Sequence, residues 1–481
     1  MINSRKILHW MIIPLVTLLL SNCSQAGEAE IVFTHVNLIP MKNEDVLENQ
    51  TVLISGSTII GIGDSDEIKI PKQAQEINGN GAYLIPGLAD MHIHTRADWE
   101  DREIWPVHPL YLYLANGVTT IRDFSPSGLP IDYALQWREE IITGKRIGPT
   151  IYASGELLYA SPLDDPAGIV DRNNELGFDF LKLYSYLSRD DFHQSMEEAE
   201  SLGMYTAGHI PYTVGLDGIL TEGMDEIAHV EELLFEFIQF DRDQKLSPEE
   251  WMHYLAESAM LQFDLDVTAN DTHFLEENED SLRQIAELLK SSNIPVSTTM
   301  VIDDIINMKL FQPEEFLKRS ESKYFESGYI KIFQRGEEKH QMQCKGVEAL
   351  CAYKYVIDCW ILKGLQAEGV LLLLGTDSGT GGMGIVPGYS IHDELNILIE
   401  NGFTPYEALK TATVNPAIIV DRMVGEGNFG TIEVGNRADL VLVLENPLTD
   451  IETLRTPRGV MSRGKWFSAE TLNQLIELPD F

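Results

Sequence analysis

The chain has 481 residues, of which 44% are hydrophobic and 23% charged, a balance typical of a globular protein with one large domain and a smaller one, or with two or three ordinary domains. Acidic residues outnumber basic ones by 75 to 35, which gives a formal net charge of −40. A chain this acidic repels nucleic acids and anionic membrane surfaces, so we expect neither as a direct partner.

Residues 1–23 have the layout of a secretory signal. Arg5 and Lys6 precede the apolar run ILHWMIIPLVTLLL, which is too short to span a membrane comfortably, because a span needs about 20 residues. The segment LSNC, which ends at Cys23, resembles the cleavage box of bacterial lipoproteins, where that cysteine is lipidated. An ordinary signal peptide cut near Ala26 is the alternative. Both predict an exported protein, periplasmic or anchored to the outer membrane, whose contact with the membrane is limited to an N-terminal lipid.

Short strands are predicted at both ends of the remaining chain. Runs such as IVFTHVNLIP near the N-terminus and RADLVLVL near the C-terminus are apolar or alternating, and Gly, Asn and Asp turns separate them. We expect residues 28–85 and 430–481 to form one small β-sandwich domain from both chain ends.

The middle of the chain, residues 86–429, alternates strand and helix patterns. Apolar runs such as VTTIRDF, DFLKLYS and GVLLLLGTD are followed by segments with apolar residues at helical spacing, such as RDDFHQSMEEAESLG. Repeated strand-then-helix units over this length predict an α/β fold, a (β/α)8 TIM barrel. The polar and helical stretch from about 305 to 360 is longer than one barrel helix requires, and we interpret it as an insertion over the barrel mouth.

Three cysteines lie close together in this helical stretch. Cys344, Cys351 and Cys359 lack the paired spacing of a zinc knuckle. An oxidising compartment would permit one disulfide among them and leave one thiol over.

Histidines and other ligand-type residues follow several of the predicted strands. In ADMHIHTRAD, His92 and His94 are two positions apart, so in a strand both imidazoles project from the same face. The barrel would bring the ends of its strands to one mouth, where active sites are built. The other residues of this kind are Lys182, His209, His229 and Asp377.

Each of these residues alone has a plain structural interpretation. A histidine at a strand end is usually a satisfied polar residue, an aspartate after a strand is usually a helix cap, and a lysine can extend along the surface to solvent. Together, on successive strands, they favour a metal site, because imidazole nitrogen and carboxylate oxygen are common ligands of divalent zinc.

Four longer segments carry a family resemblance. YLIPGLADMHIH, GVTTIRDF, PGYSIHDELNILIENGFTPYEALKTATVNPA and GTIEVGNRADLVLVLENPL are similar to signatures of the amidohydrolase superfamily of metal-dependent hydrolases. The chain most resembles the imidazolonepropionase-like and Xaa-Pro dipeptidase-like group within it. The resemblance implies two divalent metal ions, zinc by ligand type, with His92, His94 and Asp377 on one ion and His209 and His229 on the other.

The resemblance also implies a role for the remaining lysine. Lys182 would bridge the two ions as a carbamate, because a free ammonium group cannot bind a cation. A metal-bridging hydroxide would attack the substrate, and Asp377 would take its proton and pass it to the leaving group.

We therefore expect hydrolysis of a C–N amide or peptide bond in a small substrate such as a dipeptide or an N-acyl amino acid. A cyclic amidase, a lactonase and a deaminase of the same superfamily are alternatives, although Tyr212 stands where mononuclear deaminases usually place a glutamate. A non-catalytic binding lipoprotein is a weaker alternative, because such relatives tend to lose ligands. The sequence leaves the oligomeric state open, including a homo-oligomer.

Substrate contacts are less well defined by the sequence. Tyr184 and Tyr212 follow ligand positions and are candidates, with packing as the other interpretation. His392 faces either the mouth or the interior. Arg96 and Arg122 are candidates for holding a substrate carboxylate.

Overall fold

The computed structural model of the chain describes residues 29–263, 273–379 and 383–479. The predicted signal segment and Cys23 lie outside the described residues, so export and lipidation stay predictions. Among the helices of the described ranges, none is long and apolar enough to cross a membrane.

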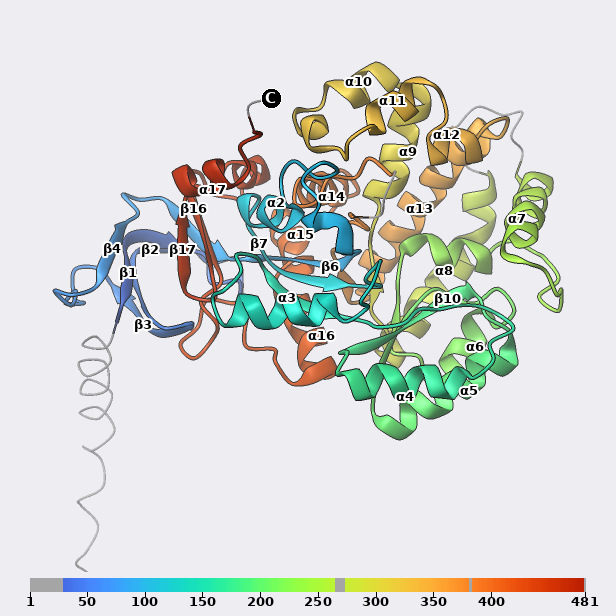
Figure 1. Cartoon of the computed structure of the whole chain (residues 1–481), viewed down its shortest axis with the longest axis horizontal. Coiled ribbons are helices and arrows are strands. Elements are labelled where there is room, and N and C mark those ends of the chain that lie inside the picture. The colour runs from blue at the N-terminus through green and yellow to red at the C-terminus, as the bar shows by residue number, and fades with distance from the viewer. Residues whose placement is uncertain (1–28, 264–272, 380–382, 480–481) are drawn as a thin grey trace, which may run out of the picture.

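Both chain ends contribute strands to one mixed sheet, which lies at one end of the molecule (Figure 1). Its order is β17-β16-β15-β5-β1-β2-β3, with β4 paired to β1. β5 and β15 join the two ends of the chain as antiparallel neighbours, with Leu84 opposite Leu442. Alternate apolar side chains of these strands are buried in a common cluster. The strands are β1 (Ile31–Leu38), β2 (Leu47–Ser55), β3 (Thr58–Asp64), β4 (Gln75–Asn78), β5 (Tyr83–Pro86), β15 (Leu440–Val443), β16 (Gly459–Ser462) and β17 (Lys465–Ser468).

The middle of the chain forms two parallel sheets, which confirms the predicted α/β fold. One sheet has the order β6-β7-β8 and the other the order β14-β13-β12-β11-β10-β9. Several of these strands are buried along their whole length, as expected for strands covered on both faces. The strands are β6 (Leu88–Ile93), β7 (Val118–Asp123), β8 (Thr150–Ala153), β9 (Leu158–Ala160), β10 (Phe180–Tyr186), β11 (Tyr205–Gly208), β12 (Glu226–Ile227), β13 (Val296–Ser297) and β14 (Leu372–Leu373).

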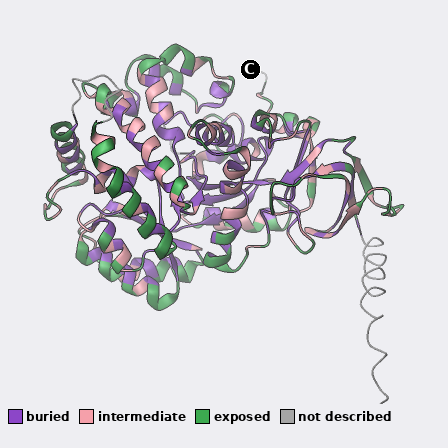
Figure 2. Cartoon of the chain, turned by 180° about the vertical axis from the view of Figure 1, so that it is seen from behind, coloured by how far each residue is buried: buried purple, intermediate pink, exposed green. Residues whose placement is uncertain are grey.

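Helices connect these strands and cover the parallel sheets, with their exposed residues on the outer faces (Figure 2). α5 shows how the sequence sets their limits: the Ser188 hydroxyl accepts a hydrogen bond from the Asp191 amide, and Gly203 ends the helix in the left-handed conformation. The apolar spacing of the segment TPYEALKTATVNPA suggests one helix, but the structure divides it between α15 and α16. The helices are α2 (Pro109–Ala115), α3 (Tyr133–Ile142), α4 (Pro166–Leu176), α5 (Arg189–Leu202), α6 (Gly215–Thr221), α7 (Pro248–Gln262), α8 (His273–Ser292), α14 (Ser390–Glu400), α15 (Pro405–Thr411), α16 (Val414–Val424) and α17 (Ala469–Leu475).

The segment between β13 and β14 is helical, and α10, α11 and α12 lie together on one side of the molecule (Figure 1). A buried ion pair joins two parts of this segment. The ammonium group of Lys309 lies 2.8 Å from a carboxylate oxygen of Glu338. Its helices are α9 (Val301–Phe311), α10 (Pro313–Lys318), α11 (Tyr329–Gln334), α12 (Lys339–Gln343) and α13 (Glu348–Glu368).

The cysteines of this segment are all thiols in the structure. The sulfur atoms of Cys344 and Cys351 are 2.7 Å apart, so these two thiols face each other. Cys359 lies two turns further along α13.

Candidate functional site

Except for Lys182, which is the third residue of β10, the predicted site residues lie at or just beyond the carboxyl ends of the parallel strands. His92 is the penultimate residue of β6 and His94 follows it, whereas the others come from four further strands. Lys182 lies in β10, His209 follows β11, His229 comes two residues after β12 and Asp377 four residues after β14.

His92, His94 and Asp377 form the most compact group. One ligand atom from each lies within 4.8 Å of the others. Nε2 of His94 is 2.9 Å from Oδ1 of Asp377, and Nε2 of His92 is 3.7 Å from the same oxygen. Two imidazoles therefore converge on one carboxylate, a donor set that suits a divalent metal ion.

Two further imidazoles extend this group. The ring centroids of His92 and His229 are 4.3 Å apart, and those of His229 and His209 are 4.8 Å apart. The structure thus brings together the four histidines that the sequence predicts as ligands. All but His94 are buried, and that side chain is 21% exposed.

The backbone at this end of the strands takes an uncommon conformation. His229, Thr299 and Asp377 have positive φ angles of 74°, 50° and 54°. Such angles are costly for residues other than glycine, by about 1–3 kcal/mol each, and they cluster at functional sites. A Cβ atom at Gly379 would overlap the backbone oxygen of His94, so only glycine permits this approach of the two segments.

Two side chains that the sequence analysis missed orient the histidines. A carboxylate oxygen of Glu232 lies 2.6 Å from Nδ1 of His209, and the Thr299 hydroxyl lies 2.8 Å from Nδ1 of His229. These contacts engage Nδ1 and leave Nε2 of each ring for another partner. HVEE places Glu232 three residues after His229, but no signal in the sequence connects it with His209.

Burial keeps the imidazoles of His92, His209 and His229 neutral. Burial lowers the pKa of His92 and His209 well below the ordinary value and that of His229 to about 3. Burial would raise the pKa of Asp377, but His94, His229 and Lys182 lower it to about 2. At neutral pH these three imidazoles therefore offer lone pairs, and Asp377 offers an ionised carboxylate.

Lys182 lies beside aromatic rings, and the charges of nearby carboxylates act on it without forming a hydrogen bond. Its side chain is buried, and Nζ has no hydrogen-bond partner among the described residues. This Nζ is 4.6 Å from the ring centroid of Phe124. Burial lowers the pKa of Lys182 to about 7. A buried polar atom without a partner is rare and calls for a further ligand.

These residues fit divalent metal ions. Both ring nitrogens of His92 are buried without a hydrogen-bond partner in the described part of the chain, as is Nζ of Lys182. Unpaired buried nitrogens are costly unless another group binds them, and neutral imidazoles are common metal ligands.

Arg122, one of the two arginines considered for a substrate carboxylate, is not available for that role. It is fully buried and forms a bidentate pair with Glu226, with Nη1 2.8 Å from Oε2. Arg96 is partly exposed and lies within ion-pair distance of Asp98 and Glu326. His392 is buried. Burial, together with the positive charge of Arg455, lowers the pKa of its imidazole to about 3.

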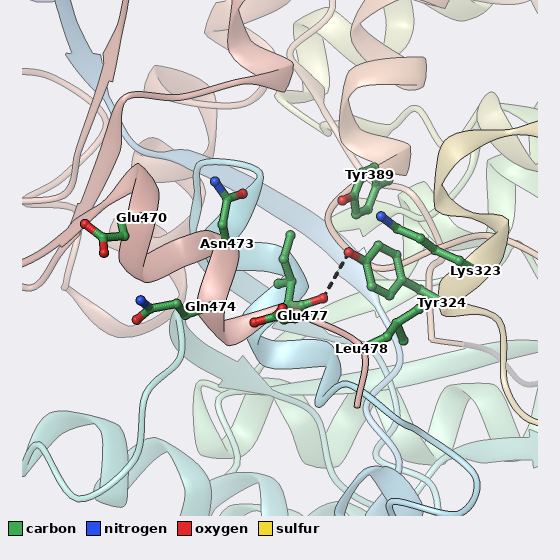
Figure 3. Close-up of a pocket in the computed structure, with 9 residues that line it drawn as sticks. Lys323, Tyr324, Tyr389, Glu470, Asn473, Gln474, Glu477 and Leu478 are labelled. Atoms are coloured by element: carbon green, nitrogen blue, oxygen red, sulfur yellow. Dashed lines mark hydrogen bonds between the residues drawn. The ribbon is translucent and has the colours of Figure 1, made fainter. Parts of the chain in front are cut away.

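A pocket on the surface lies away from these residues. It is formed by α17 and the segment that follows it together with Lys323, Tyr324 and Tyr389 (Figure 3). The Tyr324 hydroxyl donates a hydrogen bond to the backbone oxygen of Ile476, 3.1 Å away. None of the predicted ligands lines this pocket.

Comparison with known proteins gives one family. Residues 358–467, which include Asp377, match the amidohydrolase family. The ochratoxinase of Aspergillus niger is 23% identical over 474 residues, which cover 91% of this chain and 86% of that protein.

Solved structures share the fold along nearly the whole chain. A putative prolidase from Bifidobacterium longum has a TM-score of 0.62 and 21% identity, covering 93% of this chain and 98% of its own. An Xaa-Pro dipeptidase with bound methionine in the active site has a TM-score of 0.59 and 17% identity, covering 91% and 99%. Residues 358–467 thus match the amidohydrolase family, and nearly the whole chain shares the fold of these solved structures.

Proposed function

We propose that this protein is a metal-dependent hydrolase that cleaves a C–N amide or peptide bond in a small substrate such as a dipeptide or an N-acyl amino acid. The observation that carries the proposal is the convergence of His92, His94 and Asp377 at the strand ends, beside His209 and His229. The names of the ochratoxinase and dipeptidase relatives support an amide substrate.

The site residues would have two roles, metal binding and proton transfer. His92, His94 and Asp377 would hold one divalent ion, and His209 and His229 a second, for which zinc suits the ligand types. Bound metal ions would supply an activated water and polarise the scissile carbonyl. Asp377 would accept the proton of the attacking water at its carboxylate and deliver it to the leaving amine, and its low pKa keeps this group ionised beforehand.

Glu232 and Thr299 would act through the histidines. By engaging Nδ1 of His209 and His229 they fix the orientation of each ring, so that Nε2 is the nitrogen available to an ion. Burial of the group excludes bulk water and strengthens these interactions.

Lys182 would carry a carbamate when the site is loaded. Its unpartnered Nζ supports this proposal, because the neutral amine can add carbon dioxide and release a proton, which gives a carbamate anion able to bind cations. We expect native mass spectrometry of zinc-loaded protein in bicarbonate to detect two zinc ions and the mass of one carbon dioxide. The Lys182→Met variant should bind one zinc ion and no carbon dioxide. Wild-type protein with one ion and no added mass would contradict the carbamate.

The proposed reaction predicts chelator-sensitive release of amino acids. We would load the protein with zinc, incubate it with pooled dipeptides and N-acyl amino acids, and measure free amino acids by mass spectrometry. We expect release that a chelator abolishes and added zinc restores. No release from protein with two bound ions would exclude these substrates and favour cyclic amides and lactones, for which the same site chemistry serves. Release of ammonia from an amino-substituted ring would favour deamination.

We also propose that the two parallel sheets close into one (β/α)8 barrel and that the chain ends form a separate sandwich domain. Backbone bridges between Ile93 and Ser378 and between Ser154 and Phe180 support closure, because each joins one sheet to the other. An experimental structure with either seam open would contradict it.

A further inference from the structure

Three side chains project from one face of β10 beside the site. Lys182, Tyr184 and Tyr186 alternate along this strand, so they point to the same side. Lys182 is buried, whereas both tyrosines are half-buried. The face therefore runs from the unpartnered amine toward the open end of the strand.

A third tyrosine completes an aromatic surface, which we call the tyrosine stripe (Tyr159, Tyr184 and Tyr186). Tyr159 of β9 is 45% exposed. Its ring centroid lies 5.0 Å from that of Tyr184 and 5.4 Å from that of Tyr186, and the latter two are 5.6 Å apart. Each ring thus contacts both of the others at distances typical of favourable aromatic pairs.

The tyrosine stripe is continuous with the proposed metal site. The ring centroids of Tyr184 and His209 are 4.0 Å apart, and Nζ of Lys182 is 5.7 Å from the centroid of Tyr184. A substrate whose scissile bond lay at the histidines would therefore place a neighbouring group over these rings.

Packing behind the stripe holds it in place. The ring of Tyr212, which is buried, lies 5.8 Å from that of Tyr186 and 5.5 Å from that of Trp251. Tyr212 is thus a support behind the tyrosine stripe, which agrees with the packing interpretation of this residue.

The tyrosine stripe presents apolar aromatic rings that end in neutral hydroxyl groups. Among the described residues, no hydrogen bond involves the hydroxyl groups of these three tyrosines. Arg122 and Arg96, the arginines that the sequence offers for an anion, are engaged by carboxylates. An aromatic surface with free hydroxyl groups suits a large apolar or ring-bearing side chain, and its three rings are inclined to one another by 38–70°.

We propose that the tyrosine stripe is a specificity subsite that binds an aromatic side chain next to the scissile bond, so that amides of aromatic amino acids are the preferred substrates. This inference rests on the proposed function, because it places the scissile bond at the histidines. Ring-on-ring contacts and the burial of the side chain both contribute, and we expect a preference of about 10- to 100-fold in kcat/KM for phenylalanine over alanine.

The test compares N-acetyl-phenylalanine with N-acetyl-alanine in zinc-loaded protein. We expect Tyr159→Ala to raise KM for N-acetyl-phenylalanine about tenfold and to leave its kcat nearly unchanged. The kinetic constants for N-acetyl-alanine should change little. Tyr184→Phe, which keeps the ring, should retain the preference. Tyr406→Ala, a change of a partly exposed tyrosine on α15, is the matched control and should leave both compounds unaffected.

A binding measurement separates this inference from the proposed function. Calorimetry with phenylalanine and alanine as probes needs no turnover, and we expect phenylalanine to bind wild-type protein more tightly than Tyr159→Ala. If neither amide is hydrolysed but this difference holds, the proposed function fails and the aromatic subsite stands. Equal affinity for the two amino acids, or phenylalanine binding unchanged in Tyr159→Ala, would overturn the subsite even where amides are cleaved.

Discussion

The Asp377→Asn variant is expected to lose at least about 10³-fold in kcat while retaining its fold and part of its bound metal. The substitution keeps the shape of the side chain and an oxygen that can still bind a cation. It removes the negative charge that faces His94 and His92, and with it the group that accepts and returns the proton.

The measurement combines steady-state kinetics with metal analysis of the same preparation. Asp171→Asn is the matched control, because Asp171 is exposed on α4, away from the strand ends, and should keep wild-type turnover. A turnover within tenfold of wild type in Asp377→Asn would remove this residue from the proton-transfer role. Loss of both metal and turnover would assign it to metal binding, and a second assay at saturating zinc would then decide whether the proton step is also affected.

The Lys354→Met variant is expected to have a free energy of unfolding about 3–5 kcal/mol lower than wild type. The ammonium of Lys354 lies 2.8 Å from a carboxylate oxygen of Asp303 and 2.7 Å from one of Asp358. It also pairs with Glu231 at 2.5 Å. Without it, three carboxylates whose oxygens lie within 4.8 Å of one another would face each other with no cation.

Urea unfolding of the variant and of Lys363→Met gives the comparison. Lys363 is exposed on the same helix, α13, and its loss should change the free energy of unfolding by less than about 0.5 kcal/mol. Equal stability of the two variants would show that the half-buried Lys354 ammonium contributes nothing. Because Glu231 comes two residues after His229, we also expect Lys354→Met to weaken zinc binding.

The loss in free energy of unfolding caused by Lys354→Met should depend on pH. Burial raises the pKa of Asp303 and, more strongly, that of Asp358, and the loss of Lys354 removes the charge that opposes this rise. A carboxyl group whose pKa is raised in the folded state binds more protons there than in the unfolded chain, so it lowers stability as pH rises. The deficit should therefore be largest at neutral pH and shrink as pH falls toward about 4, where unfolded aspartate is protonated. A constant deficit would contradict this explanation.

The sequence by itself determined the residue types at the strand ends and the class of fold. Local patterns suffice for this, because alternation, helical spacing and turn residues act over a few neighbours. The apolar runs that end before His209, His229 and Asp377 are strands in the structure, and the pairing of β5 with β15 brings both chain ends into one sheet.

Only the tertiary structure decided what each of these residues contacts. Glu232 reaches His209 across 23 positions, Arg122 reaches Glu226 across 104, and Thr299 reaches His229 across 70. Such contacts depend on which distant strands become neighbours in the fold. Composition and residue spacing do not predict this pairing. The same holds for the tyrosine stripe, since Tyr159 and Tyr184 belong to strands whose parallel pairing sets the two rings side by side. The sequence supplies the chemical groups, and long-range packing selects which of them face the site and which, like Arg122, are neutralised inside the fold.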